Sequence, residues 1–413
     1  MRNAPALVIC LVDIYDWSRG GHFRTYFRIY SRMLLEAGHK VIAICRKPEE
    51  ITEWINQTVA AEHAVNFSAY PGHKPRRLRW LPKSISMPIA AWLRWRALAK
   101  DMRQTMTDEQ AGIDGVFLMY LEDFVPQKGW LPLWLFERTF RRPWAFLSIS
   151  SRFYREPKSP NEAARQTRRL FHPATANSCK GWCVLDEKIH GALRGLFPGA
   201  SIHLLADVTD EAPPDVDFPL AQEVLERARG RKVVSLLGLL ERRKGLLTLV
   251  RVAKQRPDIF FLFAGQYRDG AFNEEEKHEL EKFLAMVPDN CLMQASRIDT
   301  EGQFNRLVCI SDILFTAYLN FQGGSNVMTK AAVFRKPVIV STGGLCYERL
   351  ERYHLGVAIK EGSPEECSVA IDYLLSDAGR AEWRDYEGFA RIMSLDILRE
   401  QVVGLLSVFA GGS

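Results

Sequence analysis

A short basic turn, Gly238-Leu-Leu-Glu-Arg-Arg-Lys-Gly245, holds the side chains of this sequence best suited to binding an anion. It follows the apolar run Lys232–Leu237 and precedes a run with helical periodicity. Arg242, Arg243 and Lys244 are therefore expected at the carboxyl end of a strand, where cations can meet phosphate groups. The alternative is a basic turn that is merely solvated.

A second stretch, Gln322-Gly-Gly-Ser-Asn326, lies directly before a predicted helix. Gly323 and Gly324 let backbone N–H groups approach a ligand closely, and the start of a helix carries a partial positive charge. Ser325 is a candidate N-cap. The stretch predicts an anion cradle, and the alternative is an ordinary glycine-rich loop with a cap.

A third glycine-containing turn lies near the start of the sequence. Gly20, Gly21 and His22 come after the apolar run Ala6–Val12 and before an apolar-periodic helix. The glycines would let a substrate or a phosphate come close, and His22 is a candidate proton carrier. A histidine that only caps or packs is the alternative.

Two acidic residues, Glu122 and Asp123, end the apolar run Val116–Leu121. At the carboxyl end of a strand they are candidates for accepting a hydrogen bond from a ligand hydroxyl. A solvated loop explains them equally well.

These candidate residues need a scaffold that brings the carboxyl ends of several strands together. The sequence alternates apolar runs with helical periodicity, which predicts an α/β protein with two doubly wound, Rossmann-like parallel sheets and a helical C-terminal tail. The expected divisions are an N-terminal Rossmann-like domain at 1–206, a linker at 207–224, a C-terminal Rossmann-like domain at 225–380, and a helical segment at 381–413. That last segment is a candidate for packing back on the N-terminal domain.

The second half gives the clearest pattern. Its expected strands are Lys232–Leu237, Ile259–Ala264, Cys291–Gln294, Ile313–Tyr318 and Pro337–Ser341. Its expected helices are Lys244–Lys254, Asn273–Met286, Glu301–Cys309, Asn326–Phe334 and Pro364–Leu375. Ligands of such sheets bind beyond the carboxyl ends of the strands, and the cleft between the domains is the expected site.

Composition narrows the function classes. The 413 residues are 47% hydrophobic and 25% charged, which is ordinary for a folded protein and argues against a disordered or fibrous chain. No apolar run reaches the ~18 residues that span a bilayer. The eight cysteines lack zinc-site spacing, so a cytoplasmic protein without a metal is expected.

The net charge of +6 divides unevenly along the chain. Residues 1–205 contain 30 Lys/Arg against 18 Asp/Glu, a net of +12, whereas the remainder has 25 against 31, a net of −6. The basic excess is interleaved with tryptophan at Lys74–Trp80, Trp92–Arg96 and Arg141–Trp144. An anionic membrane surface is one candidate partner, reached from the inner face of the membrane. The alternative is a solvated helix face with core tryptophans, and no motif supports nucleic acid.

Taken together, these features resemble a known family. The basic turn, Gly265 after an apolar strand, and the stretch from Gln322 to Ser341 with its Arg-Lys-Pro-Val-Ile-Val-Ser look like the donor domain of GT-B glycosyltransferases. More narrowly they resemble glycosyltransferase family 4, the retaining enzymes that use nucleotide-sugars. The resemblance is good over about 225–375, moderate over 1–50 and poor over 50–200.

The resemblance implies roles for particular residues. It makes residues 1–206 the acceptor-side domain, with Glu122 and Asp123 near its acceptor-orienting positions, and residues 225–380 the nucleotide-sugar-binding domain. Lys244 matches the lysine that holds the donor diphosphate. Arg243 and His22 complete the predicted catalytic set by their own chemistry, since the family's N-terminal catalytic histidine has no match here. The predicted donor-binding residues are Gly20, Gly21, Arg242, Gln322, Gly323, Gly324, Ser325, Asn326 and Lys330. In retaining members the leaving phosphate is thought to guide the incoming hydroxyl, so neither a carboxylate nucleophile nor a metal or other cofactor is implied.

Three departures from the family pattern bear on function. The arginine expected one residue after the glycine of the basic turn is Leu239, and the two glutamates spaced E-x7-E fall on Gln322 and Lys330. Lys330 cannot accept a hydrogen bond from a ribose, although it can meet a phosphate. The expected function is transfer of a sugar from a nucleotide-sugar to a glycan, lipid-linked or polysaccharide-precursor acceptor. The alternative is a non-catalytic GT-B scaffold or glycan-binding protein.

Overall fold

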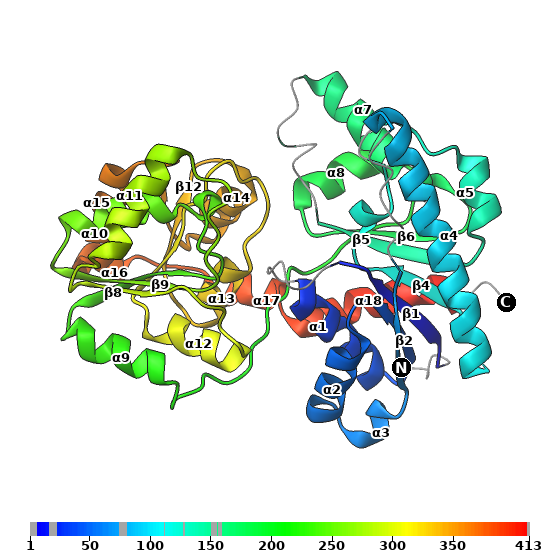
Figure 1. The fold of residues 1–413 in the computed structure, drawn as a ribbon, viewed down its shortest axis with the longest axis horizontal. Coiled ribbons are helices and arrows are strands. Elements are labelled where there is room, and N and C mark those ends of the chain that lie inside the picture. Colours follow the sequence, from blue (N-terminus) through cyan, green and yellow to red (C-terminus); the bar gives the residue numbers. More distant parts are fainter. Residues whose placement is uncertain are drawn as a thin grey trace. The chain divides into compact units, whose positions relative to one another are not determined.

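The chain forms two compact units in a computed structural model that describes residues 6–15, 23–73, 81–110, 112–126, 129–149, 155 and 159–410 (Figure 1). Unit 1 comprises residues 1–206 and 398–413, and unit 2 comprises residues 207–397. Each is built on one parallel sheet with helices on both faces, as the alternating apolar runs predict.

The sheet of unit 1 has seven strands in the order β3-β2-β1-β4-β5-β6-β7. Its strands are β1 (Val8–Asp13), β2 (Lys40–Cys45), β3 (Phe67–Pro71), β4 (Gly115–Leu118), β5 (Trp144–Ser148), β6 (Cys179–Val184) and β7 (Ile202–Leu204). The order reverses between β1 and β4, which places the topological switch point of this unit there.

Helices cover both faces of this sheet. They are α1 (Phe23–Glu36), α2 (Pro48–Thr58), α3 (Ala61–Ala64), α4 (Lys83–Glu109), α5 (Leu133–Thr139), α7 (Pro160–Phe171), α8 (Glu187–Leu196) and α18 (Leu395–Ala410). On one face Trp95 is fully buried, with its ring 4.6 Å from that of Phe136 and 5.1 Å from that of Trp144.

Helix α18 packs against strands β4 and β6, where glycines leave room for its side chains. A Cβ atom at Gly115 would lie 2.6 Å from the ring of Phe409, and one at Gly181 would overlap Leu405. Of the expected segment 381–413, the residues from 398 on thus belong to unit 1, whereas α17 (Tyr386–Ile392) packs into the core of unit 2.

The sheet of unit 2 has six strands in the order β10-β9-β8-β11-β12-β13. Its strands are β8 (Lys232–Leu237), β9 (Ile259–Ala264), β10 (Cys291–Gln294), β11 (Ile313–Thr316), β12 (Val338–Ser341) and β13 (Gly356–Ile359). Its helices are α9 (Pro219–Ala228), α10 (Leu246–Gln255), α11 (Glu274–Ala285), α12 (Glu301–Ile310), α13 (Asn326–Val333), α14 (Gly344–Tyr353), α15 (Pro364–Leu375), α16 (Asp377–Ala381) and α17.

Two hydrophobic clusters flank this sheet. One lies under α10, α11 and α15, and the other under α9, α12, α13, α14 and α17 (Figure 1). Helix α9 begins at Pro219, inside the segment 207–224 expected as a linker, so the irregular part of that segment ends at 218. No helix in the described ranges is long and apolar enough to cross a membrane.

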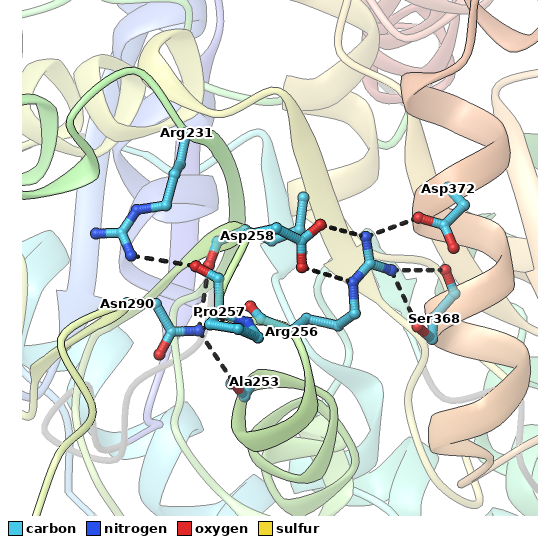
Figure 2. A network of polar contacts seen from close by, with 9 residues as sticks. Arg231, Ala253, Arg256, Pro257, Asp258, Asn290, Ser368 and Asp372 are labelled. Atoms are coloured by element: carbon cyan, nitrogen blue, oxygen red, sulfur yellow. Dashed lines mark hydrogen bonds and ion pairs between the residues drawn. The ribbon is translucent and has the colours of Figure 1, made fainter.

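A polar network holds α10, β9 and α15 together at the amino end of β9 (Figure 2). Arg256 donates to both oxygens of Asp258, at 2.9 and 2.7 Å, and to Asp372 of α15 at 2.7 Å. Asn290 donates to the carbonyl oxygens of Ala253 and Arg256 at 3.0 and 2.9 Å. The far end of α10, which begins at the basic turn, is therefore anchored by charge-assisted hydrogen bonds.

Candidate donor-binding site

The basic turn and the glycine-rich stretch meet at the switch point of unit 2, between the neighbouring strands β8 and β11. Residues Arg242–Lys244 form a single 3-10 turn after β8. The backbone N–H of Leu319 donates to the carbonyl oxygen of Arg243 at 2.8 Å. Gly245 has φ +74°, and a Cβ there would lie 2.6 Å from the carbonyl oxygen of Ala317. The close approach of the two loops thus requires glycine.

Lys244 lies at the centre of this arrangement. Its Nζ is 3.7 Å from the centre of the Tyr318 ring and 6.0 Å from that of Phe321. Burial, and next the charge of Arg243, lower the pKa of Lys244 from 10.5 to about 7. Among the ion pairs of the described residues none involves Lys244, so an incoming anion would be its first charged partner.

The two arginines of the turn are already paired with carboxylates. Arg242 donates through Nε to both oxygens of Glu276 on α11, at 2.8 and 2.7 Å, which raises the pKa of Arg242. Arg243 pairs with Glu241 at 2.7 Å and lies over the ring of Phe321 at 5.0 Å. Lys244 and Arg243 therefore share one aromatic wall, whereas Arg242 is held toward α11.

The glycine-rich stretch leads into α13 as predicted, but its serine does not cap the helix. Ser325 occupies the N-cap position without a side-chain capping bond. Its hydroxyl instead forms a 2.9 Å hydrogen bond with that of Tyr318, the residue whose ring lies beneath Lys244. The first N–H groups of α13 are left without a side-chain cap from Ser325, as an anion site at this helix start would need.

A buried ion pair lies directly behind the loop. Arg349 of α14 contacts Asp207 at 3.0 Å, and both side chains are less than 8% exposed. A Cβ at Gly324 would lie 2.5 Å from the Asp207 carboxylate and 3.0 Å from Arg349. Gly324 is thus required by packing as well as by any ligand, and the pair fixes the position of the loop.

A second helix start, not assigned a role from sequence, faces the same loop. Gly343 and Gly344 have φ of +88° and +73° and begin α14. Leu345 donates its N–H to the carbonyl oxygen of Gln322 at 3.1 Å, and the Cys346 thiol donates to that of Gly323 at 3.3 Å. The Gly-Gly pair after β12 was the available sequence signal.

Two residues predicted to bind the donor use their side chains for hydrogen bonds within unit 2. Asn326 donates to the carbonyl oxygen of Val208 at 3.0 Å and accepts from Thr209 at 2.9 Å, so its amide fastens α13 to the start of unit 2. Lys330 is 2% exposed, and its Nζ contacts Glu301 at 3.0 Å, Asn305 at 2.7 Å and the carbonyl oxygen of Asp210 at 2.8 Å. All three ammonium hydrogens have acceptors within the unit, which leaves none of them for the expected phosphate contact in this arrangement.

Replacing Lys330 by methionine tests this assignment. The change leaves buried acceptors on Asn305 and Asp210 without their donor and Glu301 without its cation. We expect the free energy of unfolding to fall by about 2 kcal/mol. The affinity for the nucleotide-sugar should change less than about threefold, which corresponds to a change in binding free energy below about 1 kcal/mol. Urea unfolding and ligand titration measure the two quantities. Lost affinity with unchanged stability would instead assign Lys330 to the ligand.

Two of the candidate residues of unit 1 lie at the carboxyl edge of its sheet. Gly20, Gly21 and His22 lie outside the described residues. Glu122 and Asp123 follow β4 in a 3-10 turn, Leu121–Asp123, at the switch point between β1 and β4. Glu122 accepts a 2.7 Å hydrogen bond from the hydroxyl of Ser148, the last residue of β5. Both carboxylates are thus at the carboxyl edge of the sheet.

Comparisons with known proteins agree with this architecture. Residues 217–388 match the family model described as glycosyl transferases group 1. Alr3699/HepE of Anabaena, solved in complex with UDP and glucose, is similar at 13% identity and TM-score 0.66, over 97% of this chain and 99% of that one. Sucrose-phosphate synthase of Thermosynechococcus elongatus is similar at 16% identity and TM-score 0.63, over 98% of this chain and 96% of that one. WaaG, a glycosyltransferase involved in lipopolysaccharide biosynthesis, is similar at 13% identity and TM-score 0.58, over 98% of this chain and 100% of that one. No curated protein matches by sequence.

The two parallel sheets have the GT-B fold, as predicted. The part of unit 2 that matches the glycosyl transferases group 1 model, residues 217–388, includes the basic turn and both helix starts.

Proposed function

We propose that this protein transfers a sugar from a nucleotide-sugar bound by unit 2 to a glycan, lipid-linked or polysaccharide-precursor acceptor, with retention and without a metal ion. The observation that carries the proposal is Lys244, held above Tyr318 beside the starts of α13 and α14 without a carboxylate partner among the described residues. Similar structures hold UDP and UDP-glucose, which supports a nucleotide-sugar donor.

Transfer of the sugar requires mainly that the protein stabilise the leaving diphosphate. As the bond to the sugar breaks, negative charge grows on the phosphate oxygens, and placed cations and helix dipoles lower the energy of that state. Lys244 and the two helix starts supply such groups, with Arg243 beside them. Gln322 stands where the resembled family has a glutamate, and its amide can hydrogen-bond sugar hydroxyls. Retention and independence from metals and other cofactors are proposed from the family 4 resemblance.

The charge of unit 1 and the position of two of its carboxylates support the proposed class of acceptor. Unit 1 has the basic excess, and Glu122 and Asp123 at its switch point are the candidates to orient an acceptor hydroxyl. An anionic glycan or a lipid-linked precursor complements a basic unit. WaaG, whose printed role is in lipopolysaccharide biosynthesis, supports this acceptor class.

A donor screen tests the proposal. The purified protein is mixed with UDP-, GDP- and ADP-sugars, and thermal unfolding and donor hydrolysis are recorded with and without EDTA. A donor at 100 times its Kd adds about 2.7 kcal/mol of stability. We expect one nucleotide class to raise the Tm, with turnover that EDTA leaves unchanged and product of the donor's anomeric configuration.

A non-catalytic scaffold is the second candidate, favoured by Gln322 and by the internal bonding of Lys330. In that case no nucleotide-sugar would raise the Tm and no donor would be turned over. Donor binding without turnover in the presence of candidate acceptors would likewise favour the scaffold.

A further inference from the structure

Three large apolar side chains of unit 1 are exposed on neighbouring elements. Ile85 in the first turn of α4 is 50% exposed, Trp130 just before α5 is 51% exposed, and Trp134 in the first turn of α5 is 66% exposed. Helices α4 and α5 pack side by side (Figure 1). Gly129 lies so close to α4 that a Cβ there would overlap the carbonyl oxygen of Ser84. We call Ile85, Trp130 and Trp134 the tryptophan patch.

Among the tryptophans of unit 1 that the structure describes, only Trp130 and Trp134 are exposed. Trp95 and Trp144 are fully buried, Trp182 is 3% exposed, and Trp54 and Trp92 are half-buried. A single exposed apolar side chain is ordinary, whereas a cluster containing two tryptophans indicates an interaction surface. Tryptophan is also the residue type most suited to the boundary between water and lipid, because its ring is apolar and its N–H is polar.

Cations outnumber acids in the two segments that contain the patch. Sequence segments 81–100 and 129–142 together contain seven Lys or Arg and only one acidic residue, Glu137. Six of the seven are exposed, namely Lys83, Arg96, Lys100, Arg138, Arg141 and Arg142.

Helix geometry places two of these cations beside the patch, and we call them its basic rim. Lys83 lies in the first turn of α4 together with Ile85. Arg138 follows Trp134 by four residues and so lies on the same face of α5. The guanidinium of Arg96 lies 4.8 Å over the ring of Trp92, whose N–H donates to Thr139 at the end of α5.

We propose that the tryptophan patch and its basic rim dock the protein on an anionic lipid surface. The tryptophan rings enter the headgroup region while the arginines and lysines meet lipid phosphates, and each cation near such a surface adds to binding. The surface deepens the proposed function, because a lipid-linked acceptor would be met at the membrane. Docking itself does not require sugar transfer.

Vesicle sedimentation tests the surface directly. The full chain is spun with phosphatidylcholine vesicles, either pure or containing a third phosphatidylglycerol. We expect binding to the anionic vesicles that weakens with added salt, and little binding to the neutral ones. The double variant Trp130→Ser, Trp134→Ser and the double variant Lys83→Gln, Arg138→Gln are each expected to bind the anionic vesicles at least tenfold more weakly.

The matched control is Trp383→Ser, because Trp383 of unit 2 is 68% exposed yet lies outside the patch. It should bind vesicles as the unaltered protein does. All variants should keep the same Tm and the same Tm rise with nucleotide-sugar, which separates failure of docking from failure of the proposed function. Unaltered vesicle binding in the tryptophan double variant would overturn the proposal. Retention by soluble anionic polysaccharide but not by vesicles would overturn it in favour of a glycan surface.

Discussion

Sugar transfer is expected to fall about 100- to 1000-fold in kcat/KM when Lys244 is replaced by alanine, the loss typical of removing one group that stabilises developing charge. The ammonium of Lys244 lies over Tyr318, whose hydroxyl bonds Ser325 at the start of α13, whereas Arg242 and Arg243 are paired with glutamates. Steady-state kinetics with the donor identified by screening measures the loss.

Stability distinguishes this loss from damage to the fold. Because burial lowers the pKa of Lys244 to about 7, holding its charge opposes folding at neutral pH. Lys244→Ala should therefore be at least as stable as the unaltered protein in urea unfolding. Reduced activity accompanied by reduced stability would contradict a direct role at the phosphates.

The pH profile of donor affinity follows from the same pKa. Below pH 7 Lys244 is charged in the free protein, and above it the ammonium must regain a proton as the diphosphate binds. Affinity should be greatest below about pH 7 and fall by up to tenfold per pH unit above it. A nucleotide-sugar suits the titration, because its diphosphate does not titrate in this range. Lys244→Arg keeps its charge, so its profile should be flat.

Replacing Gly265 by alanine is expected to cost unit 2 about 3–5 kcal/mol, the sum of backbone strain and steric overlap. Gly265 follows β9 with φ +145°, and a Cβ there would overlap the carbonyl oxygen of Gly238 at the start of the basic turn. The overlap is with backbone, so no side-chain rotation relieves it. Donor-dependent stabilisation should weaken too, since Gly238 must move.

Gly270 provides the matched control, because it lies in the same loop and a Cβ there would meet no atom within 4 Å. Gly270→Ala should stay within about 0.5 kcal/mol of the unaltered protein. Equal unfolding midpoints in urea for the two variants would refute the role assigned to the contact between Gly265 and Gly238.

Sequence patterns were most informative in unit 2, where buried strands are continuous apolar runs bounded by turns. Strands β8, β9 and β10 and helix α15 have the predicted bounds. The strand β13, Gly356–Ile359, was missed because it is short and begins with glycine, a residue type that is depleted in strands. The expected strand Ile313–Tyr318 ends at Thr316, since Tyr318 turns its ring beneath Lys244.

The site was predictable where a motif is local and not where its partners are distant in sequence. The basic turn and the glycine-rich stretch do meet, because both follow adjacent parallel strands. Nothing in the sequence pairs Asp207 with Arg349, 142 residues away. The basic and aromatic stretches likewise mix two environments: Trp95 and Trp144 are core residues, whereas the exposed rings are Trp130 and Trp134.

Helix α18 has a consequence for how the protein is made. Unit 1 is encoded in two stretches, 1–206 and 398–413, so its sheet leaves the ribosome before the helix that covers β4 and β6. At 5–20 residues per second, translation of unit 2 leaves that apolar surface uncovered for roughly 10–40 seconds. Unit 2 is continuous in sequence and can finish folding first. Until α18 is synthesised, the apolar surface of unit 1 at Gly115 and Gly181 stays uncovered, and we expect a chaperone to bind it.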